Sequence, residues 1–198
     1  MTDLQSWVAP TYRGLADLLD ASNAAAWDSP SLCERWLVRH VVAHVTMPAR
    51  MTHEQFGAEM AAVGGDFTTM SDSVAFRDAA LPDEYLLDQL RSPTLHAWQP
   101  PGGGAAGAVS HAVIHSLDVT IALDRPAVAP RESIAAVLEQ LTAAGGSVFG
   151  IDLTEVRLEA TDSDWAWGDG RPVRADAGQL VALLSGRTLP DGRTLHRS

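Results

Sequence analysis

Two histidines spaced four residues apart, His111 and His115, are the residues of this 198-residue chain best placed for chemistry. On a helix, such residues lie one above the other on the same face, so both imidazoles can bind one metal ion. His44 lies in a separate apolar segment, Val-Val-Ala-His-Val, where we expect it to point toward the interior. An unpaired buried imidazole is costly, and a metal ion would satisfy it. We therefore predict a metal site formed by His44, His111 and His115.

Three protein ligands leave at least one coordination position for water or substrate, which is typical of catalytic metal sites. Imidazole nitrogens suit zinc, nickel, copper or iron, so the ligand type alone does not choose among them. We expect zinc first, with nickel or iron as alternatives. The competing interpretation is that these are surface or hydrogen-bonded core histidines. His40 competes with His44 because the two are also four residues apart. The remaining histidines lie in polar or loop-like segments and are expected at the surface: His53, His96 and His196.

Other side chains are candidates for supporting roles. Asp118 follows His115 by three residues and either fixes the tautomer of a ligand imidazole or is a solvated carboxylate or a helix cap. Arg187 or Arg171 either binds a substrate carboxylate or lies at the surface. The only cysteine, Cys33, excludes an internal disulfide, and we interpret it as a small buried residue at a helix start. Trp165 and Trp167 either line a cleft or pack in the core.

Hydrophobic periodicity predicts the elements that position these residues. We expect helices over residues 3–22, 31–62, 72–80, 82–98, 105–123, 130–144 and 176–185. Ser31 and Glu34 have capping-box spacing, and Pro48 should kink or divide its helix. After residue 147 the period changes to two, and Asp169-Gly170 suggests a hairpin turn. The predicted domains are a metal-binding helical bundle over 1–147 and a small α/β domain over 148–198.

Composition narrows the functional classes. The net charge of −11 disfavours nucleic acid and anionic lipid as partners. No apolar run reaches the roughly 18 residues of a membrane-spanning helix. The N-terminus lacks the basic start and the apolar stretch of a signal peptide, so we expect a cytoplasmic protein. All 14 basic residues are arginine, and this GC-rich residue usage suggests a high-GC bacterial genome.

Three short motifs resemble one family. Residues 36–44, Trp-Leu-Val-Arg-His-Val-Val-Ala-His, resemble the Trp-x-Val-Arg-Asp-Val-Val-Ala-His stretch of the DinB-like superfamily, specifically its mycothiol-dependent maleylpyruvate isomerase branch. His111-x-x-x-His115-x-x-Asp118 resembles that family's (Glu or His)-x-x-x-His-x-x-Asp helix, in which the isomerase branch has Glu at the first position. Residues 160–168 and 183–187 are similar to the family's small C-terminal domain. The motifs occur in the family's order along nearly the whole chain.

The resemblance implies a mainly α fold: a DinB-like four-helix bundle followed by a small C-terminal α/β domain. It also implies a divalent metal on three side chains and a thiol cofactor, usually mycothiol in actinobacteria. A metal-coordinated thiol loses its proton more easily, and the thiolate is the nucleophile. The leading hypothesis is a thiol transferase or thiol-assisted isomerase acting on a small electrophile, as a monomer or a homodimer. Two alternatives stay open: a bundle protein that binds metal or a small ligand without catalysis, and one whose metal is structural.

Overall fold

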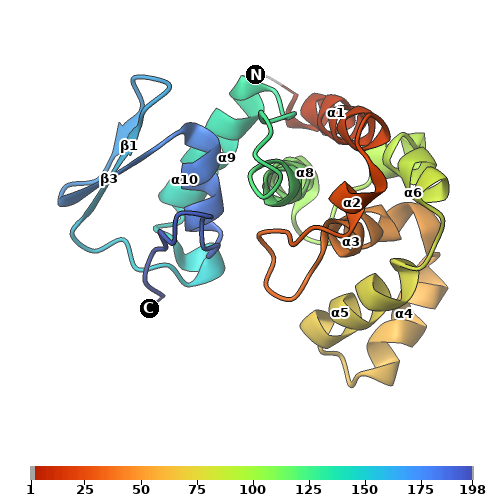
Figure 1. Cartoon of the computed structure of the whole chain (residues 1–198). Coiled ribbons are helices and arrows are strands. Elements are labelled where there is room, and N and C mark those ends of the chain that lie inside the picture. The colour runs from red at the N-terminus through yellow and green to blue at the C-terminus, as the bar shows by residue number, and fades with distance from the viewer. Residues whose placement is uncertain (1–2, 198) are drawn as a thin grey trace.

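Helices form most of the chain, and a small sheet follows them (Figure 1). The computed structural model describes residues 3–197, so residues 1, 2 and 198 of the predicted domains lie outside the described part. The predominance of helices confirms the predicted mainly α fold class. In chain order the elements are η1 Leu4–Trp7, α1 Val8–Asp20, α2 Ala24–Trp27, α3 Val38–Arg50, α4 His53–Ala62, α5 Phe67–Asp78, α6 Asp83–Leu90, α7 Pro93–Ala97, α8 Gly104–Thr120, α9 Arg131–Ala143, η2 Ser147–Phe149, β1 Val156–Ala160, β2 Ala166–Trp167, β3 Arg171–Ala175 and α10 Ala177–Leu184.

Four helices pack around a first hydrophobic core. Their contacts run in a cycle, from α1 to α6, α3, α8 and back to α1. Each helix contributes apolar side chains at the three- and four-residue spacing of a buried helical face. These residues include Leu15 and Leu19 of α1, Val41 and Val45 of α3, Leu86 and Leu90 of α6, and Ala108 and Ala112 of α8. The periodicity of these helices thus accounts for the apolar faces that they bury against one another.

Helix α8 lies between this bundle and the C-terminal part of the chain (Figure 1). Its other apolar face carries Val109, Val113 and Leu117, which belong to a second core with α9, α10 and the sheet. A helix that is apolar on two sides has to be buried on both. The bundle helices α1 and α3 pack on one side of α8, and α9 and α10 pack on the other. The bundle and the C-terminal part of the chain therefore both rest on α8. The boundary between residues 147 and 148 remains a prediction.

The helix expected over 31–62 differs from the structure at its start. Residues 30–37 form a loop closed by a bridge between Pro30 and Leu37, and Arg35 has a φ of +66°, which a helix does not allow. The capping box at Ser31 and Glu34 is therefore wrong: the Ser31 hydroxyl donates to the Trp36 carbonyl instead. The expected division does occur, between Arg50 and His53, whereas Pro48 itself lies inside α3. The helix expected over 82–98 also divides, into α6 and α7.

The hairpin expected at Asp169-Gly170 is wrong. That turn joins β2 to β3, which lie on opposite sides of β1 in the order β2-β1-β3. Leu158 pairs with Trp167 of antiparallel β2 and with Val173 of parallel β3. The period of two was correct, but it does not specify which strands pair. Gly170 serves a different purpose, because a Cβ there would lie 2.0 Å from the Glu155 carbonyl oxygen.

The first prediction concerns the packing of α10 on α8. A Cβ at Gly178 would lie 2.9 Å from Cδ2 of Leu117 on α8. Gly178→Val should therefore lower the free energy of unfolding by about 1–3 kcal/mol through overpacking. Gly57 in α4 has open space around it, so Gly57→Ala should raise that free energy by about 0.4–1 kcal/mol. Urea denaturation measures both, and equal effects of the two substitutions would contradict this packing.

Candidate metal centre

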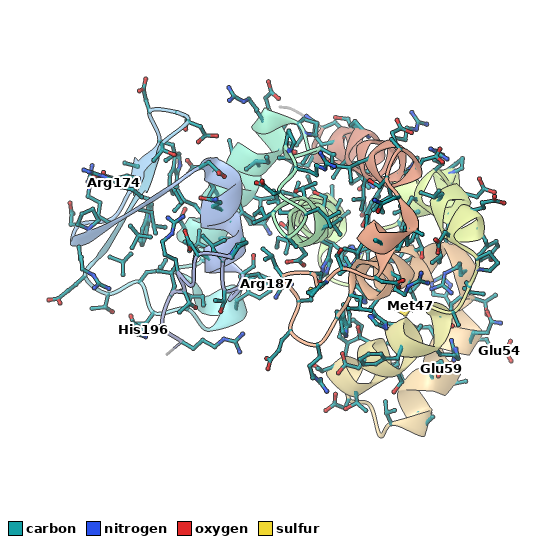
Figure 2. All side chains as sticks on the ribbon, viewed as in Figure 1. Met47, Glu54, Glu59, Arg174, Arg187 and His196 are labelled. Carbon is teal, nitrogen blue, oxygen red and sulfur yellow. The ribbon has the colours of Figure 1, made fainter. Side chains whose placement is uncertain are left out.

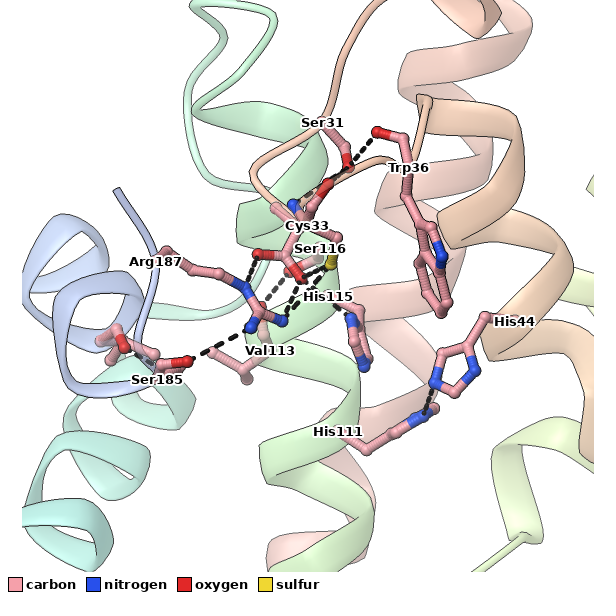
Figure 3. Close-up of polar contacts among 12 residues, drawn as sticks. Ser31, Cys33, Trp36, His44, His111, Val113, His115, Ser116, Ser185 and Arg187 are labelled. Carbon is pink, nitrogen blue, oxygen red and sulfur yellow. Dashed lines mark hydrogen bonds and ion pairs between the residues drawn. The ribbon is translucent and has the colours of Figure 1, made fainter. Parts of the chain in front are cut away.

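The three predicted ligand histidines lie together between α3 and α8 (Figure 3). His44 is on α3, while His111 and His115 are one helical turn apart on α8. Nε2 of His44 and Nε2 of His111 are 3.2 Å apart, and the three ring centroids are separated by 4.8–5.2 Å. One ligand nitrogen from each ring lies within 4.8 Å of the other two. The structure thus brings together all three residues from two helices that are distant in sequence.

The second nitrogen of each ring has its own oxygen partner. Nδ1 of His44 lies 2.9 Å from the Ser71 hydroxyl on α5, and Nδ1 of His111 lies 2.9 Å from the Tyr12 hydroxyl on α1. Nδ1 of His115 lies 2.9 Å from Oδ2 of Asp118. Metal-binding histidines usually donate their second N–H to such a partner, which fixes the tautomer and the orientation of the ring. Side chains from α1, α5 and α8 therefore orient the three rings, and Nε2 of His44 faces Nε2 of His111.

The electrostatics of the site suit a cation. Burial, followed by the neighbouring His115, lowers the pKa of both His44 and His111 well below the usual range, so both rings are neutral at physiological pH. Burial opposes the ionisation of Asp118, but hydrogen bonds from His115 and Arg187 outweigh it and lower the pKa of the carboxyl. Neutral imidazoles with oxygen partners on their outer nitrogens form a donor set that fits a divalent ion.

The hydroxyl groups of Tyr12 and Ser71 make the site compatible with two proton arrangements, because a hydroxyl either donates or accepts. When Nε2 of His111 donates to Nε2 of His44, the Tyr12 hydroxyl donates to Nδ1 of His111. When Nε2 of both rings faces a cation, each Nδ1–H donates to its hydroxyl oxygen instead. A proton shift within fixed positions is enough to change between the two.

A second group of potential ligands, Cys33, His115 and Asp118, lies beside the first. The Arg187 guanidinium donates to both Asp118 oxygens, at 2.8 and 3.0 Å, and to Sγ of Cys33 at 3.4 Å. A metal ion there would lie against this positive charge. Burial, followed by Asp118, raises the pKa of the Cys33 thiol, which stays protonated and donates to Oδ2 of Asp118. This group is therefore a hydrogen-bonded network, and Cys33 lies in the 30–37 loop rather than at a helix start.

A cavity of about 510 Å³ opens beside the histidines. His44, His111, His115 and Arg187 all line it, and Arg187 lies between the helical bundle and the C-terminal part of the chain (Figure 2). The other walls come from α3, α4, α5, residues 98–101, α8 and Phe149. They consist of Met47, Pro48, Met51, Thr52, His53, Phe56, Phe67, Trp98, Gln99, Pro100, Pro101, Gly107, Ser110, Ile114 and Phe149.

The other candidates lie outside the histidine cluster. Nδ1 of His40 accepts the Leu37 N–H and caps α3, so His40 is not a competitor of His44. His196 is exposed, whereas His53 is exposed on the cavity wall and partly buried His96 bonds to the Leu90 carbonyl. Arg171 is exposed on β3, and Asp118 is fully buried rather than solvated. Trp165 and Trp167 pack against the second core and are not among the residues that line the cavity.

Comparisons with known proteins bear on the family and the fold of the chain. Residues 8–99 match the model of the mycothiol maleylpyruvate isomerase N-terminal domain, which confirms the predicted resemblance. A crystal structure of the mycothiol-dependent maleylpyruvate isomerase is 18% identical, with a TM-score of 0.57 over 98% of this chain and 95% of that one. A mutant of that enzyme gives 17% identity and a TM-score of 0.56 with the same coverage. At these identities the structures establish the shared fold.

No functionally curated protein matches the chain. Within residues 3–197, no helix combines the length and the apolar character needed to cross a membrane.

The second prediction concerns ligand identity. Untagged protein should bind one zinc ion per chain, and His44→Ala, His111→Ala or His115→Ala should each abolish binding because two imidazoles remain. Elemental analysis after gel filtration measures the stoichiometry. His40→Ala and Cys33→Ala are the matched controls and should keep the metal. Loss of zinc in Cys33→Ala with retention in His44→Ala would instead support the second group.

The third prediction concerns the hydroxyl partners. Ser71→Ala and Tyr12→Phe each remove one oxygen that orients a ligand ring, so each should weaken zinc binding about 10–100-fold. Competition with a chromophoric chelator measures the affinity. Ser73→Ala on the exposed side of α5 and Tyr85→Phe at the surface remove the same groups away from the site, and both should bind zinc like the unmodified chain. Equal affinities for all four variants would show that these hydroxyls do not orient the ligands.

Proposed function

We propose that this chain is a metal-dependent enzyme that joins a low-molecular-weight thiol of the mycothiol type to a small electrophile, as a thiol transferase or a thiol-assisted isomerase. The observation that carries the proposal is the position of three imidazoles on the wall of the cavity. Three protein ligands leave a coordination position that a small molecule in the cavity can reach. The proposed identity of the thiol rests on the names of the family model that matches residues 8–99 and of the solved relatives, both of which include mycothiol.

His44, His111 and His115 would hold the divalent ion, for which we propose zinc, with nickel or iron as alternatives. The bound ion supplies the charge that lowers the pKa of a coordinated thiol and keeps it as a nucleophilic thiolate. Asp118 accepts the Nδ1–H of His115 and so increases the basicity of its Nε2. Ser71 and Tyr12 orient the other two rings in the same way.

The other residues of the cavity exclude water and offer a few polar contacts. Its apolar walls protect a thiolate from solvation, which strengthens electrostatic interactions inside. Thr52, Gln99 and Ser110 provide hydrogen-bonding groups for the polar parts of a thiol. Arg187 keeps Asp118 ionised, and its hydrogen bonds to Asp118, Cys33 and the Ser185 carbonyl use four of its five N–H groups, which leaves one on Nη1. We propose that Arg187 acts as a positioning residue for His115 through Asp118.

The fourth prediction tests this function. Zinc-loaded protein should accelerate the reaction of mycothiol with monobromobimane, and His115→Ala should reduce the rate to that of the uncatalysed reaction because metal binding is lost. Fluorescence of the bimane conjugate measures the rate, with His40→Ala as the matched control. Removal of zinc by a chelator should stop turnover, and added zinc should restore it. Full turnover by zinc-free protein would refute the mechanism, whereas zinc and thiol binding without turnover would identify a ligand-binding protein.

A further inference from the structure

From the cavity walls we infer the class of electrophile: an uncharged, apolar molecule with a flat aromatic body or an aliphatic body, rather than a dicarboxylate. This inference rests on the proposed function. The supporting observations are the composition of the walls and the pairing of the only permanently charged side chain among the described residues that line the cavity, Arg187.

Most of the cavity wall is apolar. Its side chains come from four helices and the 98–101 segment, and several are aromatic: Phe56, Phe67, Trp98 and Phe149. The Trp98 ring packs edge-on against His111, with 5.3 Å between ring centroids, so one aromatic wall adjoins the proposed ligands directly. Aromatic rings prefer such offset or edge contacts with another flat ring. An apolar electrophile would bury its body against these residues.

The charge of Arg187 is already compensated. Nε and Nη2 bind the two Asp118 oxygens, Nη1 donates to the Ser185 carbonyl, and Nη2 also reaches Sγ of Cys33 (Figure 3). The opposite charges of Arg187 and Asp118 cancel, and the ion pair is held in place because the Asp118 side chain is only 1% exposed. To bind a substrate carboxylate through two N–H groups, Arg187 would have to give up one of these partners, and losing the buried Asp118 is strongly unfavourable.

A dicarboxylate therefore lacks a permanently charged partner in this cavity, because the wall groups of Thr52, Gln99 and Ser110 are uncharged. Burying a carboxylate requires a cation and hydrogen bonds, and the described wall residues offer no second arginine. One carboxylate group on the metal ion would occupy the position that the thiol requires, and the other would still face apolar walls. A neutral electrophile encounters neither problem.

The transfer reaction with such a molecule is balanced. A sulfur–carbon bond forms, and the bond between that carbon and its leaving group breaks. The leaving group, such as bromide, departs with the electron pair of the broken bond, and the thiol proton passes to water. Neither an oxidant nor a reductant is needed, so the cavity has to bind only the thiol and the electrophile.

The fifth prediction compares the binding of two probes by isothermal titration calorimetry. Zinc-loaded protein should bind an unreactive bimane without the bromide at least tenfold more tightly than the maleate dianion. The metal-free His115→Ala variant should keep this preference, because it arises from the walls rather than from the metal. This binding measurement does not depend on turnover, so failure of the proposed activity and failure of this inference are distinguishable.

Charge placed on the wall should reverse the preference. Phe67 is 51% exposed and lines the cavity, so Phe67→Arg should fold and should reduce the bimane-to-maleate ratio at least tenfold. Phe76, also on α5 and 44% exposed, is outside the cavity lining, and Phe76→Arg should leave the ratio unchanged. Maleate binding equal to or tighter than bimane binding in the unmodified protein would overturn the inference, as would an equal response to the two arginine variants.

Discussion

The buried carboxylate of Asp118 is the interaction on which the site depends. It accepts hydrogen bonds from His115, Arg187 and Cys33, and its backbone carbonyl accepts the Leu32 N–H. The bundle, the 30–37 loop and the segment after α10 are thereby fixed to one residue. An unpaired buried charge costs about 3–5 kcal/mol, so the hydrogen bonds from His115 and Arg187 are needed to keep the carboxylate ionised. The orientation of a proposed ligand is thus coupled to the docking of the C-terminal part.

Helix α8 makes this coupling possible because its faces have separate tasks. His111, His115 and Asp118 follow one another at spacings of four and three residues and share one face. Val109, Val113 and Leu117 face the second core, while Ala108 and Ala112 face the bundle. With packing on both sides, α8 has little freedom to rotate or slide. Side chains on such a rigid element keep their positions more accurately than side chains on loops.

The sequence predicted the parts of the site that depend on local geometry. The His111–His115 spacing has a fixed meaning on a helix, and the apolar neighbours of His44 indicated a buried ring. Tyr12 and Ser71 were missed, because each meets its histidine only when α1 packs on α8 and α5 packs on α3. Only the need of a buried tyrosine hydroxyl for a partner hinted at Tyr12. The predicted hairpin and the predicted helix start at residue 31 were wrong for a similar reason. Periodicity identifies a strand or a helix, but it does not identify the strand's partners or the positive φ at Arg35.

The distribution of charge connects the ligand set with the chemistry. The chain carries a net charge of −11, yet none of the described residues that line the cavity is acidic. The carboxylate nearest the histidines, Asp118, is neutralised by Arg187. Three imidazole ligands would leave the proposed divalent ion with its full charge, whereas the glutamate that the isomerase branch has at position 111 would cancel part of it. Because apolar walls screen charge weakly, that extra charge would act mainly on the molecule in the open position and would favour a thiolate there.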